Sequence, residues 1–152
     1  MKEKKNVTKL YNVIFPFWML VLFPYFWLII FPANFIIDSL VLIAAMFVLK
    51  IEGKKMWYKK HIVKIFSFGM LSDFIGALYM LLIMLLFENF GLAIDDLRLT
   101  LPALVISAVL IFVLNYFITF RKSEKIIRQK MSLIFAIVTA PYTFLIPISW
   151  MY

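Results

Sequence analysis

The stretch VIFPFWMLVLFPYFWLIIFPANFIIDSLVLIAAMFVL, residues 13–49, contains 37 residues and one charged side chain, Asp38. As a single α-helix it would be about 55 Å long, well beyond the ~30 Å hydrocarbon core of a bilayer. The chain must therefore turn within it. Residues 31–34 (FPAN) offer turn chemistry, because Pro32 disfavours a helical conformation in Phe31 and Asn34 can cap the next helix. We expect two membrane spans, at about 11–31 and 34–49, the second short enough to be re-entrant.

The rest of the chain has the same character. Hydrophobic residues make up 65% of the 152 residues and charged residues 16%, whereas soluble domains are close to half apolar and a quarter charged. Three more apolar stretches, at about 65–87, 101–120 and 131–152, are long enough to cross a membrane. We therefore predict an all-α, polytopic transmembrane helix bundle of five spans, forming a single domain over residues 1–152.

The distribution of charge gives this threading an orientation. The chain carries 16 Lys and Arg against 8 Asp and Glu, and 15 of the 16 basic residues lie in residues 2–9, 50–64 and 121–130. Five spans would place these three segments on one side of the membrane. The positive-inside rule then predicts a cytoplasmic N-terminus and an external C-terminus. We expect a multi-pass protein of a bacterial cytoplasmic membrane, and no nucleic-acid binding, because the charge is spread along one membrane face.

Two acidic residues, Asp38 and Asp73, lie inside predicted spans. An ionised side chain near the centre of a spanning helix costs about 2.5–3.5 kcal/mol on insertion scales, so such residues usually face the interior of a helix bundle. Each is a candidate for binding a proton or a cation. The alternative is a packing role, and for Asp38 also a favourable interaction with the start of its helix.

Polar and small residues follow the acids at helical spacing and predict a shared interior. The predicted polar path consists of Asn34, Asp38, Ser72, Asp73, Ser107 and Asn115. Gly69 and Gly76 flank Asp73 by four and three residues, and we expect them to allow close helix packing. Serine and asparagine stripes also serve helix packing alone, and that alternative applies to Asn34, Ser72, Ser107 and Asn115 as well.

No catalytic centre, metal site or cofactor is predicted. The chain lacks Cys, and its one histidine, His61, has no partner at metal-ligand spacing. With a span that begins at residue 34, Asp38 would lie about 6 Å below the outer surface and Asp73 about 12 Å above the inner one. A catalytic carboxylate pair needs oxygens a few ångströms apart, so we expect no enzyme.

The basic segment 50–64 is expected to be a cytoplasmic loop at the membrane surface. Its residues Lys54, Lys55, Trp57, Lys59 and Lys60 are predicted to contact anionic lipid headgroups. The simpler alternative is that these lysines only set the orientation of the protein.

These features favour a transport-related protein. The first hypothesis is a proton- or cation-linked transporter, or a membrane subunit of a larger one, with membrane lipids and a second copy or another membrane protein as partners. The alternative is a non-catalytic accessory protein that binds a lipid or another apolar ligand. An intramembrane enzyme is the third and least favoured hypothesis.

Overall fold

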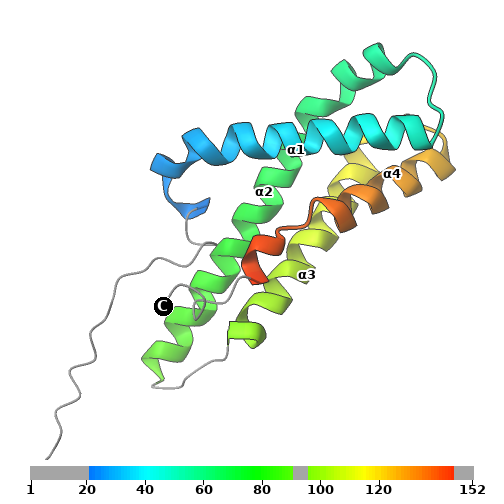
Figure 1. The fold of residues 1–152 in the computed structure, drawn as a ribbon. Coiled ribbons are helices and arrows are strands. Elements are labelled where there is room, and N and C mark those ends of the chain that lie inside the picture. Colours follow the sequence, from blue (N-terminus) through cyan, green and yellow to red (C-terminus); the bar gives the residue numbers. More distant parts are fainter. Residues whose placement is uncertain (1–20, 91–95, 146–152) are drawn as a thin grey trace, which may run out of the picture.

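The computed structural model describes residues 21–90 and 96–145 of the chain, which form an all-α fold (Figure 1). Four α-helices are present there, with a 3-10 turn, η2 (Pro24–Phe26), before the first. The helices are α1 (Trp27–Val48), α2 (Lys54–Asn89), α3 (Asp96–Leu114) and α4 (Lys125–Val138). A π-helical turn, η3 (Asn115–Thr119), continues α3, and a 3-10 turn, η4 (Tyr142–Leu145), follows α4.

Helix α1 passes straight through Pro32, so the turn predicted at residues 31–34 is wrong. The break lies one Phe-Pro pair earlier, at η2, where Pro24 occupies the first position and needs no N–H partner. Within α1, packing outweighs the local preference of Pro32: Phe31 stacks on Trp27 at 5.3 Å and meets Phe66 of α2 edge to face at 5.9 Å. The expected helix at 34–49 is the C-terminal part of α1, and residues 11–20 of the first expected span lie outside the described residues.

Helix α2 is also longer than predicted, because most of the basic segment 50–64 is helical and not a loop. The connection after α1 is a tight turn in which Lys50 and Gly53 have positive φ values of 51° and 63°. From Lys54 the helix continues without a proline for 36 residues, or about 54 Å. It therefore exceeds the thickness of a bilayer core, and its basic first turns extend beyond the apolar part.

The predicted fifth span is interrupted near Pro141, where the sequence predicts a bend. Helix α4 begins at Lys125 and ends at Val138, so it measures only about 20 Å. Pro141 lacks the N–H that would continue the helix, and it disfavours helical geometry at Ala140. The chain therefore leaves α4 through residues 139–141, the α4–η4 link, and re-forms a turn at η4. Residues 146–152 lie outside the described residues.

Three helical stretches are long and apolar enough to cross a membrane in the described part of the chain: Pro24–Val48, Lys54–Phe87 and Leu97–Thr119. Many of their large apolar side chains are exposed, among them Leu28, Ile29 and Phe47. A contiguous apolar surface of this kind is unfavourable in water and expected against lipid. The five-span threading stays a prediction.

Most buried apolar residues of the described part form two separate clusters. Figure 1 shows α2 and α3 lying along each other, α1 crossing α2, and α4 beside α3. One cluster, around Ile65, Phe120 and Phe135, joins all four helices at the end where α1 meets α2. The other, around Ala77 and Phe144, joins α2, α3 and η4. Between Ile65 and Ala77, the α2 segment from Gly69 to Asp73 belongs to neither cluster.

Candidate functional site

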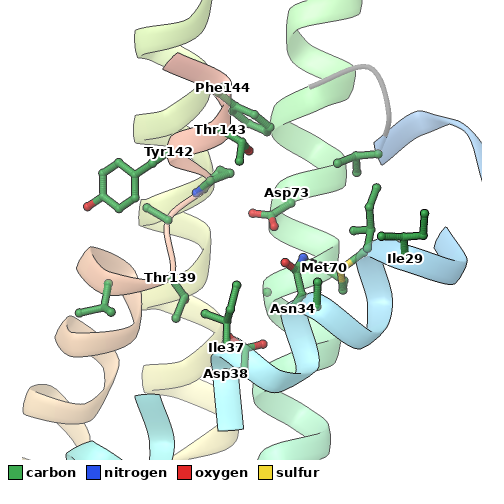
Figure 2. Close-up of a pocket in the computed structure, with 17 residues that line it drawn as sticks. Ile29, Asn34, Ile37, Asp38, Met70, Asp73, Thr139, Tyr142, Thr143 and Phe144 are labelled. Carbon is green, nitrogen blue, oxygen red and sulfur yellow. Dashed lines mark hydrogen bonds between the residues drawn. The ribbon is translucent and has the colours of Figure 1, made fainter. Parts of the chain in front are cut away.

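A cavity of about 380 Å³ lies against this segment of α2 (Figure 2). Its wall consists of residues between Ile29 and Asp38 on α1, residues between Gly69 and Asp73 on α2, and all seven residues from Val138 to Phe144, with Val21 at the edge. We call it the acid cavity, because Asp38 and Asp73 both line it.

Asp73 is a buried polar residue of the acid cavity. Its side chain is 9% exposed, and its Oδ1 atom is buried without a hydrogen-bond partner. Figure 2 shows the carboxyl group projecting from α2 towards the α4–η4 link. A buried carboxylate without a partner is strongly disfavoured in an apolar medium, so Asp73 requires a proton or a bound cation to neutralise it.

Asp38 reaches the same cavity from α1. It is 5% exposed, and its Oδ2 atom lies 3.5 Å from the position that a Cβ atom would occupy at Gly69. Gly69 precedes Asp73 by one turn of α2, or about 6 Å along the helix axis. The two acids therefore approach the same segment of α2 from neighbouring levels.

The two acids do not lie at the different depths that the sequence predicts. Asp38 would lie near the outer surface only if its helix began at residue 34, whereas α1 begins at Trp27. Asp38 consequently lies about 16 Å into its helix, near the middle of a span and not near its end. Both acids line one cavity, so a large difference in depth no longer distinguishes them.

The α4–η4 link forms the wall of the cavity opposite α2. The N–H of Thr139 still donates to the carbonyl of Phe135, at 3.0 Å, and the N–H of Phe144 donates to the carbonyl of Pro141, at 2.9 Å. In a continuous helix, residue 141 would donate to the carbonyl of Ile137, but proline has no N–H. The hydroxyl of Tyr142 donates to that carbonyl instead, which satisfies the backbone at the break.

Asn34, the third polar residue predicted for the path, also lines the acid cavity. Its Nδ2 atom donates to the sulfur of Met70 at 3.1 Å, so it links α1 to α2 rather than capping a helix. Beyond these groups the wall is chiefly apolar, and none of the described residues that line it is basic.

The remaining members of the predicted path lie elsewhere. Ser107 on α3 donates to the backbone carbonyl of Ser72 at 2.9 Å, and the Ser72 hydroxyl donates to the carbonyl of Phe68 at 2.7 Å. Ser107 therefore joins α3 to the backbone of α2, whereas the Ser72 hydroxyl bonds within α2. Asn115 begins the π-helical turn, where its Nδ2 atom donates to the carbonyl of Ile111 at 2.9 Å and its Oδ1 atom is buried without a partner.

The two glycines have different surroundings. A Cβ atom at Gly76 would collide with the Ser107 hydroxyl and would stand 2.8 Å from Phe144 and 3.3 Å from the carbonyl of Ala103. At Gly69 the nearest atom would be the Asp38 carboxylate, at an ordinary contact distance. Gly76 thus allows α3 and η4 to approach α2, whereas Gly69 leaves room beside Asp38.

The residues predicted to contact lipid headgroups lie on the first turns of α2. Lys54, Lys55, Lys59 and Lys60 are exposed, and the ammonium group of Lys54 lies 4.4 Å from the ring centroid of Phe47. Trp57 turns inward: its ring stacks on Phe120 with centroids 5.5 Å apart, and it lies 4.0 Å from the ring of His61.

Sequence reasoning did not assign Met70, Tyr142 or Phe144 to the site. The one signal for the C-terminal wall is Pro141, which predicts a bend in the fifth span. Within residues 21–90 and 96–145, no three His, Cys, Asp or Glu side chains are grouped in a way that could hold a metal ion.

Comparison of the chain with protein-family models, with curated protein sequences and with solved structures found no match. The fold and the site define an all-α protein with three helices suited to crossing a membrane and two acids buried on a shared cavity. Its function is therefore inferred from the site itself.

Proposed function

We propose that this chain is a small multi-span protein of a bacterial cytoplasmic membrane that takes part in the transport of protons or cations, with Asp73 and Asp38 as the polar site. The observation that carries this proposal is the Oδ1 atom of Asp73, buried without a partner beside a cavity that Asp38 also lines. A carboxylate is costly at this depth, and the usual reason for one is a role in ion or proton movement.

The broken C-terminal helix supports the same function. In many transporters, the sites for substrate and coupling ion lie at interrupted helices near the middle of the membrane. Here the α4–η4 link faces Asp73 across the acid cavity (Figure 2). Non-helical backbone at membrane depth is tolerated where it lines such a cavity.

The orientation follows from the two basic segments at one end of the fold. Stacking of Trp57 on Phe120 brings the first turns of α2 close to residues 121–130. By the positive-inside rule this end lies in the cytoplasm. A five-span threading then has a cytoplasmic N-terminus and an external C-terminus, and the exposed lysines of α2 contact anionic headgroups. With so few helices, a second copy or another membrane protein would complete a transport path.

A second candidate function is binding of an apolar ligand or lipid without transport, and the largely apolar wall of the cavity favours it. In that case the acids serve assembly. We assign no catalytic role to the pair, because neither acid lies in a Gly-x-Gly-Asp motif of the kind found in intramembrane aspartyl peptidases.

Reconstitution in liposomes tests the transport function. The purified protein is placed in vesicles with an imposed pH or potassium gradient, and flux is followed with a fluorescent pH indicator or a potassium electrode. We expect flux with the wild type and with Glu52→Gln, an exposed acid in the α1–α2 turn. Asp73→Asn should remove it while eluting from gel filtration as the wild type does. Equal flux in Asp73→Asn would overturn the proposal.

A further inference from the structure

We infer that the ligand of the acid cavity is a small organic cation, whose ammonium group pairs with Asp73 and Asp38 and whose apolar body packs against the cavity wall. This inference rests on the proposed function in that it uses the same site. It adds the chemical class of the substrate.

The size and lining of the cavity are those of a site for an organic molecule. Its volume of about 380 Å³ lies in the range of small-molecule sites, and such sites combine a mostly apolar wall with a few polar groups that fix the ligand. Ile29, Ile37 and Phe144 contribute to the apolar part of the wall, and the two acids supply the polar groups. A proton or a bare metal ion would leave most of this apolar volume unused.

The polar groups select for positive charge. Two carboxyl groups line the cavity, and none of its described lining residues is basic, so an anionic ligand would meet only like charge. The buried Oδ1 atom of Asp73 has an unused acceptor position, which an ammonium N–H can occupy as a charge-assisted hydrogen bond. A ligand with an ammonium group would therefore supply both the positive charge and the hydrogen-bond donor that the buried Asp73 carboxylate lacks.

A hard metal ion fits the cavity less well. Calcium takes six to eight oxygen ligands, and magnesium requires close to ideal octahedral geometry. In the α4–η4 link, the carbonyls of Ala140 and Pro141 already accept backbone hydrogen bonds, from Tyr142 at 2.7 Å and from Phe144 at 2.9 Å. Among the described residues, no third His, Cys, Asp or Glu side chain joins the two acids, so such an ion would depend on neutral oxygens or water for most of its ligands.

Binding of 2-phenylethylammonium tests the inference, with uncharged 2-phenylethanol as a probe of nearly the same shape. Isothermal titration of the purified protein in mild detergent should detect the ammonium probe and little or no binding of the alcohol. Because removal of one partner from a buried charge pair is costly, Asp73→Asn should bind the ammonium probe about 30-fold more weakly or worse. Glu52→Gln should bind it as the wild type does. Circular dichroism and gel filtration establish that each variant is folded.

A second variant keeps the test decisive if Asp73→Asn fails to fold. Asp38→Asn should also weaken binding of the ammonium probe, without a matching effect on the alcohol. Equal binding of the alcohol and the ammonium probe, or unchanged binding in both variants, would overturn the inference.

The liposome assay separates this inference from the proposed function. Proton or potassium flux that depends on Asp73, in a protein that does not bind 2-phenylethylammonium, would reject the organic cation and leave the transport function standing. Binding that depends on Asp73 in a protein without flux of the probe, protons or potassium would support the ligand class and reject transport.

Discussion

The carboxylate of Asp38 on α1 lies against Gly69 on α2, with its Oδ2 atom 3.5 Å from the place of the missing Cβ. A side chain larger than alanine at residue 69 would occupy the space into which this carboxylate extends. Asp73 follows one turn later on the same helix and lines the same cavity. Asp38 thus lies beside the turn of α2 that precedes Asp73, and the two acids of the predicted polar path line one cavity.

The two glycines of α2 should respond differently to alanine. Gly76→Ala places a methyl group into the Ser107 hydroxyl and 2.8 Å from Phe144, and overpacking of this kind costs about 1–3 kcal/mol. Gly69→Ala meets only an ordinary contact and gains helix propensity, so its free energy of unfolding should change by less than about 1 kcal/mol. Unfolding in mixed detergent and SDS micelles measures both. Equal destabilisation by the two substitutions would contradict this prediction.

Ser107→Ala should separate packing from transport. The substitution removes the hydrogen bond from α3 to the carbonyl of Ser72, and interhelical bonds in membrane proteins contribute about 0.6 kcal/mol on average. Since the side chain does not line the acid cavity, flux in liposomes and binding of 2-phenylethylammonium should stay within about twofold of the wild type, a change of less than ~0.5 kcal/mol. Loss of flux in a folded Ser107→Ala protein would return Ser107 to the polar path.

Trp57→Ala should destabilise the protein more than a lysine substitution on the same turns. The Trp57 ring stacks on Phe120 and contacts His61, so its removal takes away aromatic packing as well as buried area. We expect a loss of about 2–3 kcal/mol, somewhat below the cost at a fully buried tryptophan. Lys59→Ala should leave stability nearly unchanged and lower the affinity of the detergent-solubilised protein for added phosphatidylserine, by about 1 kcal/mol at most. The two variants need both a stability and a lipid-binding measurement.

Pro141→Ala should close the break after α4. Alanine restores the N–H that a helix would direct to the carbonyl of Ile137, where the Tyr142 hydroxyl now donates. We expect slower amide hydrogen exchange around residues 139–142 and weaker binding of the ammonium probe, because the link forms one wall of the cavity. Exchange and binding like those of the wild type would show that the break does not depend on this proline.

The class of fold follows from composition and apolar length, which makes it predictable from the sequence. The helix boundaries do not. Three Phe-Pro pairs precede residue 33, and local preferences cannot tell that Pro24 marks a boundary while Pro32 lies inside α1. That choice depends on tertiary contacts, such as that of Phe31 with Phe66. The wrong turn at Pro32 also placed Asp38 near a helix end, and the predicted difference in depth between Asp38 and Asp73 was wrong for the same reason.

The acids themselves are predictable, because a carboxylate in an apolar span is a conspicuous feature in any register. Which other polar residues share the cavity with the acids is harder to predict from the sequence. Ser72 and Asp73 are adjacent in sequence and therefore differ by about 100° around the helix axis. That rotation keeps Ser72 out of the cavity, where its backbone carbonyl accepts a hydrogen bond from Ser107 of α3, and directs Asp73 towards α1 and the α4–η4 link. Only the positions of the neighbouring helices determine that Ser72 serves packing and that Asp73 lines the cavity.

A double-mutant cycle can determine whether the two acids act as one site. If Asp38 and Asp73 hold the same cation, each single change to Asn removes most of the advantage of positive charge, and the double variant should bind 2-phenylethylammonium hardly more weakly than the weaker single variant. Groups in contact with one ligand commonly show interaction energies of about 0.5–3 kcal/mol in such cycles. Isothermal titration of the wild type, both single variants and the double variant measures this quantity. Losses that simply add would show that the two acids contribute to binding independently, contrary to a shared cavity in which Asp38 reaches α2 one turn from Asp73.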